Sequence, residues 1–214
     1  MKTLRPFTAS HGDYDNGLFY PSSGGEGPDE PSADAALVAR RLIREGLADY
    51  FALDVDVYVG SGIPWYPGRG VAKPLCRPDA FVAFGVRLGE RASWHLKREV
   101  IVPAVCLYVE TPSNRAAVLG PIKDRCERLG VKEYLVFSDD RVAGFRLRGK
   151  RYGGIRPGGD GGIRSRLLGL RLVNEYGEPR FVEAATGEVV LTRHEQAIRS
   201  VRAKRAELTP RTGD

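Results

Sequence analysis

The chain of 214 residues carries 33 lysines and arginines against 27 aspartates and glutamates, a formal net charge of +6. A hydrophobic fraction of 42% beside 28% charged residues is typical of globular proteins and argues against a disordered or fibrous chain. No apolar run approaches the roughly 20 residues of a membrane span, and the first residues are polar, so we expect one cytoplasmic domain with no membrane partner.

The net charge bears on possible partners, and the cysteines bear on disulfides and metal sites. A positive balance permits an acidic partner such as DNA or RNA but does not by itself indicate one. Cys76, Cys106 and Cys126 are odd in number and widely spaced. This pattern favours buried thiols over a disulfide framework or a zinc site.

The N-terminal part predicts an arm followed by a helix. Residues 1–33 are rich in Gly, Pro, Ser and acidic residues and have no periodicity, so we expect a flexible arm. From about Asp34, apolar residues recur at helical spacing, with Leu37, Val38 and Leu42 on the same stretch. We therefore expect the folded part of the chain to begin with this helix.

Three strands should follow this helix. Val55, Val57 and Val59 alternate with more polar residues, which predicts a half-buried strand. Residues 78–86 and 104–110 have the apolar character of two further short strands, each entered shortly after a proline.

A second helix should span residues 115–130. Ser113 or Asn114 is available to cap its start. Gly120 and Pro121 lie inside it and should kink its first turns, because proline cannot donate the helical hydrogen bond.

The rest of the chain alternates short strands with turns up to residue 192, and a basic helix begins at Arg193. The whole pattern predicts an α/β or α+β domain, in which helices flank a mixed β-sheet and an antiparallel meander lies toward the C-terminus. We divide the chain into an arm (1–33), a folded domain (34–192) and a basic C-terminal helix and tail (193–214).

Three residues have the character of a metal-dependent phosphodiesterase site. Asp79 opens one predicted strand, Glu110 ends the next, and a lysine lies nearby. Carboxylates hold a hard cation such as Mg²⁺, and a lysine can orient or polarise the attacking water. The alternative for Asp79 is a turn or cap residue, a common role for aspartate after proline.

The sequence resembles the Uma-two family of restriction-endonuclease-like proteins, in the PD-(D/E)XK nuclease superfamily, from residue 34 to about 207. The segments that carry the resemblance are, in order, RPDAFVAFGV with GERASW, VPAVCLYVETPSNR, ERLGVKEYLVFSDD, RSRLLGLRLV and RFVEAATGEVVLTRHEQA. It implies a restriction-endonuclease-like core over 34–192, Mg²⁺ as cofactor, DNA as substrate and a homodimer as a possible assembly.

The resemblance transfers only part of the active site. Asp79 matches the first metal-binding aspartate of the family. Tyr108 stands where the family has its strand glutamate, and Ile122 where it has its helical lysine. Glu110 shares a strand face with position 108 and Lys123 is next to 122, so each could substitute for the missing group.

Basic residues gather in the second half of the chain. A run over residues 146–166 could form a strip that contacts phosphates, and a solvated sheet face is the alternative. Its candidate nucleic-acid-binding residues are Arg146, Arg148, Lys150, Arg151, Arg164 and Arg166. The C-terminal helix, with Arg193, Arg199 and Arg202, suits contact with DNA or pairing with another subunit.

Two functions from different classes follow. The first is a Mg²⁺-dependent DNA endonuclease with Asp79 and Glu110 on the metal and Lys123 near the attacking water. The alternative is a catalytically lapsed homologue that binds nucleic acid or acts as a protein-interaction module.

Overall fold

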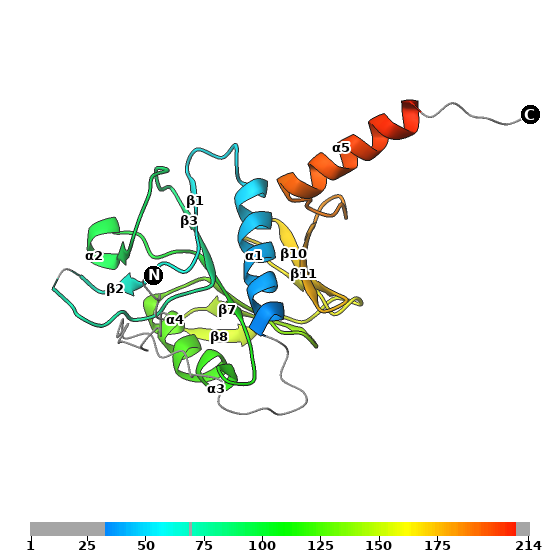
Figure 1. Ribbon diagram of the computed structural model, residues 1–214. Helices are drawn as coiled ribbons and strands as arrows, with labels where there is room; N and C mark the ends of the chain where they lie inside the picture. Colours follow the sequence, from blue (N-terminus) through cyan, green and yellow to red (C-terminus); the bar gives the residue numbers. More distant parts are fainter. Residues whose placement is uncertain (1–32, 69, 209–214) are drawn as a thin grey trace, which may run out of the picture.

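A mixed β-sheet forms the centre of the structure, a computed structural model that describes residues 33–68 and 70–208 (Figure 1). Its six strands are β1 (Val57–Gly60), β3 (Ala80–Phe84), β5 (Val105–Val109), β6 (Glu133–Phe137), β7 (Val142–Arg148) and β8 (Arg151–Gly154). They are neighbours in that order, with β5 and β6 parallel and every other pair antiparallel. The sheet, its helices and two smaller sheets make the fold α+β, as the sequence predicts at this coarse level.

Helix α1 (Ala33–Tyr50) covers one face of the sheet and confirms the predicted first helix. Leu37, one of the apolar residues at helical spacing, lies off the buried side of the helix and is 60% exposed. The buried side chains recur at helical spacing and are Ala36, Ala39, Ile43 and Leu47. Two small alanines let the first turns of the helix lie close to the sheet.

The connection from β5 to β6 covers the opposite face as an interrupted helix: α3 (Arg115–Ala117), the π-helical turn η1 (Val118–Ile122) and α4 (Lys123–Leu129). The predicted kink is confirmed, because Gly120 leaves helical geometry (φ −115°, ψ −109°) immediately before Pro121. Gly130 ends α4 at φ +86°, a left-handed conformation that glycine adopts readily.

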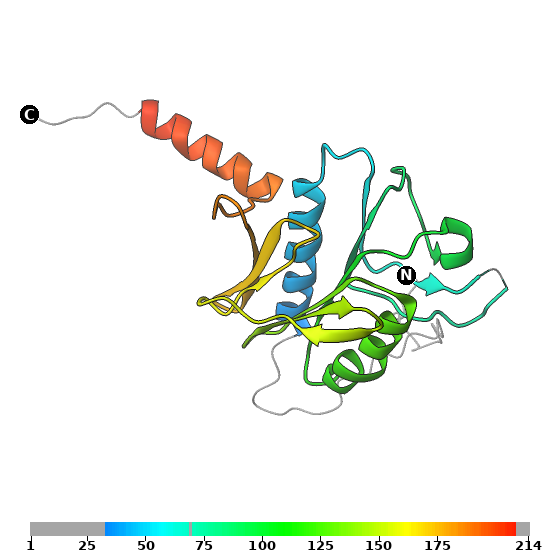
Figure 2. The same ribbon diagram turned by 180° about the vertical axis from the view of Figure 1, so that it is seen from behind.

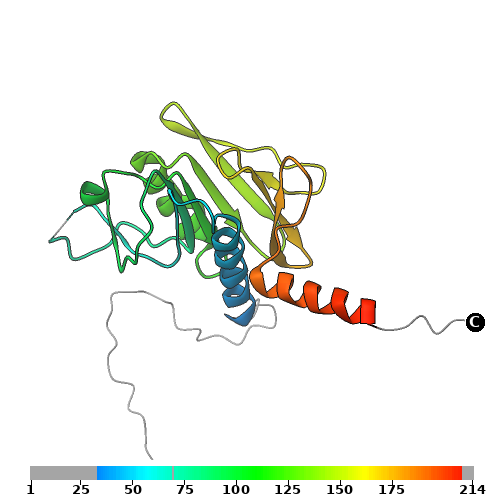
Figure 3. The ribbon, with the colours of Figure 1, turned by 90° about the horizontal axis from the view of Figure 1, so that it is seen from above.

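Two smaller sheets complete the fold (Figures 2 and 3). The antiparallel strands β9 (Ile163–Arg164), β10 (Leu170–Glu175) and β11 (Glu178–Glu183) pack on α1, which shares one apolar cluster with them and with the large sheet. On the other side, β2 (Trp65–Tyr66) pairs with β4 (Trp94–His95), next to the short helix α2 (Leu96–Glu99). The predicted meander is therefore divided between the large sheet and a separate sheet.

The first strand is buried on both faces, contrary to the prediction of a half-buried strand. Val57 and Tyr58 are 7% and 8% exposed, whereas Val55 precedes the strand and is 77% exposed. The two faces are covered by different elements: α1 lies over Val57, and the Trp65–Trp94 cluster packs against Tyr58. Alternation in sequence does not reveal this double coverage.

The structure describes the predicted C-terminal helix but almost none of the predicted N-terminal arm. The predicted arm lies outside the described residues except for Ala33, where α1 begins. The basic helix is present as α5 (Arg193–Leu208), and its tail from residue 209 onward is not described. Within residues 33–68 and 70–208, no helix combines the length and the apolar character needed to cross a membrane.

Candidate functional site

Asp79 lies immediately before β3 and joins several elements through hydrogen bonds. Its Oδ1 accepts a hydrogen bond from Arg40 Nε of α1 at 2.8 Å, and its Oδ2 accepts one from the Val109 amide at 2.8 Å. Its backbone carbonyl accepts a third from the Ser61 hydroxyl at 2.8 Å. Burial raises the pKa of Asp79, and Arg40 and the Val109 amide lower it by less. These contacts agree with a structural role for this aspartate.

Tyr108 is opposite Asp79 and lines the same pocket. The antiparallel register of β3 and β5 pairs Ala80 with Leu107. Asp79 and Tyr108 are the next residues outward from this pair, so their side chains share a sheet face. The pocket is a cavity of about 360 Å³ that Arg40 and Ile122 also line. Tyr108 is 4% exposed, and its ring lies 5.3 Å from that of Tyr134 in the apolar cluster below. The position that carries a carboxylate in the family is thus filled by a buried phenol.

Glu110 belongs to a different set of contacts. Its carboxylate pairs with Arg141 at 3.1 Å and with Arg115 at 3.3 Å, and its side chain is 4% exposed. It lines a small cavity beside the first turns of α1, and the lining of the Asp79 pocket does not include it. Two arginines therefore neutralise this carboxylate within the fold.

The Asn114 side chain closes the end of β5 instead of bonding the first turn of the helix that follows. Its Oδ1 accepts a hydrogen bond from the Thr111 amide at 2.8 Å, and its Nδ2 donates one to the Val109 carbonyl at 3.0 Å. Its side chain makes no cap hydrogen bond to α3. Asn114 is therefore the N-cap residue by position, as predicted, but its side chain does not bond the helix, because the turn after β5 uses both ends of its amide.

Lys123 contacts β7 and does not line the Asp79 pocket. Its Nζ lies 4.8 Å from the centroid of the Phe145 ring, where a cation is attracted to the aromatic face. Ile122, one residue earlier, is the residue that lines the pocket. The three predicted catalytic residues therefore lie in three separate sets of contacts.

The residues around Asp79 do not fit the Mg²⁺ ion that the resemblance implies. Mg²⁺ requires near-octahedral oxygen ligands at about 2.0–2.1 Å. Here a guanidinium binds one carboxylate oxygen of Asp79, and a phenol stands where the second carboxylate would be. Among the described residues, no group of three or more His, Cys, Asp or Glu side chains could hold a metal ion.

The predicted basic strip separates into paired and unpaired residues. Arg146 is half-buried and donates to Glu133 at 2.7 Å, a carboxylate that also accepts a hydrogen bond from Ser165. Arg151 pairs with Glu127 at 3.2 Å. Within residues 33–68 and 70–208, no acidic side chain pairs with the remaining exposed members, Arg148, Lys150, Arg164 and Arg166.

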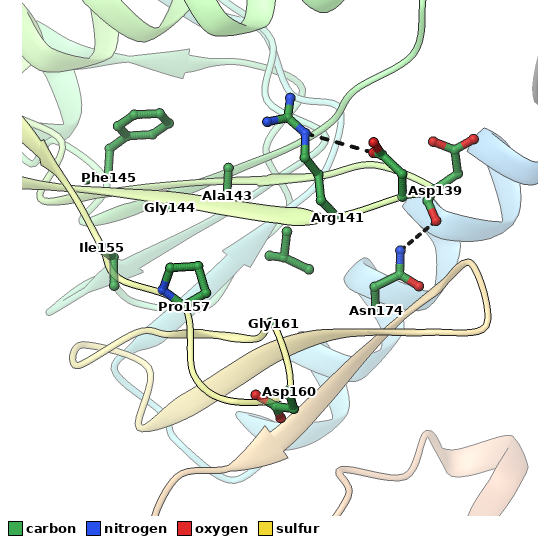
Figure 4. A pocket seen from close by; sticks show the side chains of 13 residues that line it. Asp139, Arg141, Ala143, Gly144, Phe145, Ile155, Pro157, Asp160, Gly161 and Asn174 are labelled. Carbon is green, nitrogen blue, oxygen red and sulfur yellow. Dashed lines mark hydrogen bonds and ion pairs between the residues drawn. The ribbon is translucent and has the colours of Figure 1, made fainter.

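A further pocket lies between β7, the loop after β8 and β10 (Figure 4). It is an open hollow of about 650 Å³ with Ala143, Phe145, Ile155 and Pro157 among its apolar lining residues. Its polar lining includes Asp139, Asp140 and Asp160 together with Arg141. This acidic character does not suit a polyanion, so the pocket is distinct from the basic strip.

The three cysteines come together beneath Tyr108, which the sequence analysis missed. Cys76, Cys106 and Cys126 are free, buried and part of one apolar cluster, which confirms the prediction of buried thiols. A hydrogen bond with Cys126 raises the pKa of Cys76, and burial raises that of Cys106. A signal was available in the sequence, because Cys106 and Tyr108 are two residues apart on one strand and so share a face. The helix that carries Cys126 covers this face.

The Tyr108 hydroxyl lies among these thiols. It is buried and has no hydrogen-bond partner of ordinary geometry among the described residues. Burial raises its pKa well above the usual value for tyrosine. The phenol therefore packs as an apolar ring with an unsatisfied polar end.

Comparison with known proteins adds no relative to these observations. No protein-family model matches the chain, and no curated protein matches it at a significant level. The resemblance to the Uma-two family therefore stays a prediction.

Proposed function

We propose that this chain is a restriction-endonuclease-like protein that binds nucleic acid without hydrolysing it. The architecture supports the first part of the proposal. A mixed sheet lies between α1 on one face and the interrupted helix α3–α4 on the other, which agrees with the core that the resemblance implies.

The observation that carries the proposal is the state of Asp79. Its two carboxylate oxygens bind Arg40 and the Val109 amide, and Tyr108 closes the facing wall of its pocket. A catalytic metal ion must be held by several ligands that leave a position open for water. The side chains that would supply such ligands are used here to hold the fold together.

Unpaired positive charge supports the binding part. Arg148, Lys150, Arg164 and Arg166 are exposed, and no described acid neutralises them. Arg146 links β7 to β9, because its Nη2 donates to the Arg164 carbonyl at 3.1 Å. Exposed cations on β7, on β9 and in the residues that follow them are suited to phosphate contacts.

The experiment measures cleavage and binding on one preparation. Supercoiled plasmid is incubated with Mg²⁺ and with wild-type protein or the variants Asp79→Ala and Asp79→Asn. We expect no nicking by any of the three proteins. Fluorescence anisotropy with a 20-base-pair DNA should show binding that weakens steeply with salt, because each phosphate contact adds about 0.9 to the log–log slope.

A triple variant tests the strip, namely Arg148→Gln, Lys150→Gln and Arg164→Gln. It should bind more weakly than wild type and show a shallower salt slope. Mg²⁺-dependent nicking that both Asp79 variants abolish would overturn the proposal in favour of the endonuclease. Absence of any anisotropy change at low salt would overturn it in favour of a protein-interaction role.

A further inference from the structure

Helix α5 is fixed to the body at its first turn. Thr192 and Glu195 form a capping box: the Thr192 amide donates to Glu195 Oε2 at 2.8 Å, and the Glu195 amide donates to Thr192 Oγ1 at 3.3 Å. Arg180 of β11 also pairs with Glu195, and Arg193 pairs with Asp49 of α1 at 2.9 Å. The direction of the helix is therefore set by the two elements beneath it.

Beyond this turn, α5 projects away from the rest of the structure (Figures 1 to 3). Every described side chain from Arg193 to Arg205 is exposed except Glu195, which is half-buried. Residues 199–204 contain three cations and no acid, and no described acidic side chain pairs with Arg199, Arg202 or Lys204.

This composition suits a polyanion better than a protein or a membrane. Among its exposed large apolar side chains are Ile198 and Val201, 37% and 66% exposed, which make too narrow a stripe to bury against a partner. A second copy of the chain would present the same positive helix, and like charges repel. A nucleic acid supplies the complementary charge along the whole exposed length.

We infer that α5 enters the major groove of double-stranded DNA. Its 16 residues span about 24 Å, and the B-form major groove, about 12 Å wide, admits one helix. The major groove of A-form RNA is too deep and narrow for this contact. The inference rests on the proposed nucleic-acid binding, and it assigns the duplex and the groove to an element distinct from the strip of residues 146–166.

The test uses the full chain and two triple variants with equal loss of charge. The first carries Arg199→Gln, Arg202→Gln and Lys204→Gln, which keep good helix formers in α5. The matched control carries Lys73→Gln, Arg87→Gln and Arg98→Gln, three exposed cations outside α5 and the strip. Circular dichroism verifies that all three proteins fold equally.

The α5 variant should bind the 20-base-pair DNA about a hundredfold more weakly at low salt, with the salt slope reduced by about 2 to 3. The control should change by less than about threefold, since its cations are scattered over other surfaces. Wild type should bind duplex RNA of equal length more weakly than DNA. Methyl green, a major-groove ligand, should displace the protein, and the minor-groove ligand netropsin should not.

Three outcomes would overturn the inference. Undiminished DNA binding by the α5 variant would overturn it while leaving the proposed function intact, whereas absence of binding by wild type would overturn both. A wild-type dimer that the α5 variant converts to a monomer, with equal DNA affinity per chain, would assign the helix to self-association instead.

Discussion

The interior of the large sheet and the outer surface of the molecule use their charges differently. Asp79, Glu110 and Glu133 lie at or near strand ends, and each is bound by at least one arginine of the same fold. The exposed cations Arg148, Arg164, Arg199, Arg202 and Lys204 have no such acidic partner among the described residues. A carboxylate that already has a guanidinium is poorly placed to hold a metal ion, whereas an unpaired surface cation is free to meet a phosphate.

Removal of the Glu133 carboxylate should cause the largest loss of stability among these interior charges. Its side chain is 1% exposed and joins Arg146 to Ser165 and to the Arg166 amide. Glu133→Ala should lower the free energy of unfolding by about 3–5 kcal/mol, because it leaves a desolvated arginine unpaired. Urea unfolding followed by circular dichroism measures the change.

Arg164→Gln is the matched surface control for this prediction. Its side chain is exposed, so the free energy of unfolding should change by less than about 0.5 kcal/mol. Comparable losses in the two variants would mean that the interior and surface charges do not differ as described.

Asp79 tests the same contrast at the predicted metal ligand. Asp79→Ala leaves Arg40 and the Val109 amide without their acceptors, and it should cost about 1–3 kcal/mol of unfolding free energy. Asp79→Asn keeps an acceptor for one of these donors and should cost less. Urea unfolding at neutral pH separates the two variants.

The pH dependence of Asp79→Asn gives the sign of this electrostatic effect. Burial raises the folded-state pKa of Asp79 above 3.8, so its contribution to stability is present below that pH and is lost as the pH rises through the folded-state pKa. The unfolding free energy of Asp79→Asn minus that of wild type should therefore increase as the pH rises from 4 to 7. The opposite slope would indicate a lowered pKa, as expected of a carboxylate poised for a cation.

Tyr108 gives the smallest expected effect, in the stabilising direction. Tyr108→Phe removes a buried hydroxyl that has no partner of ordinary geometry, and it should raise the free energy of unfolding by up to about 1 kcal/mol. Tyr134→Phe is the control, because its hydroxyl donates to the Val118 carbonyl at 2.8 Å, and this variant should lose stability by a similar amount. Equal signs in the two variants would contradict the assignment of an unsatisfied hydroxyl to Tyr108.

The sequence predicts local structure better than it predicts which groups meet. The first helix, the kink at Gly120 and the basic C-terminal helix depend on periodicity and on proline and glycine chemistry, which act over a few residues. The buried face of α1 depends on how closely Ala36 lets the helix approach the sheet, and this is a property of packing.

The candidate site shows the same limit. That Tyr108 and Ile122 depart from the family pattern is visible in the sequence, and both line the pocket beside Asp79. The partner of Asp79 is not visible there, because Arg40 precedes it by 39 residues and meets it through tertiary packing. For Glu110, one neutralising arginine, Arg115, begins α3, and the other, Arg141, lies in the turn before β7.

The buried cysteines allow the opening of the folded structure to be followed by thiol labelling. Alkylating reagents require an accessible thiolate, and the folded chain supplies neither access nor a low pKa at Cys76, Cys106 or Cys126. Alkylation of one of these thiols therefore requires that the helix over β5 has moved away from the sheet or that the sheet has opened. The rate of that labelling reports how firmly the interior of the sheet is closed, without any engineered probe.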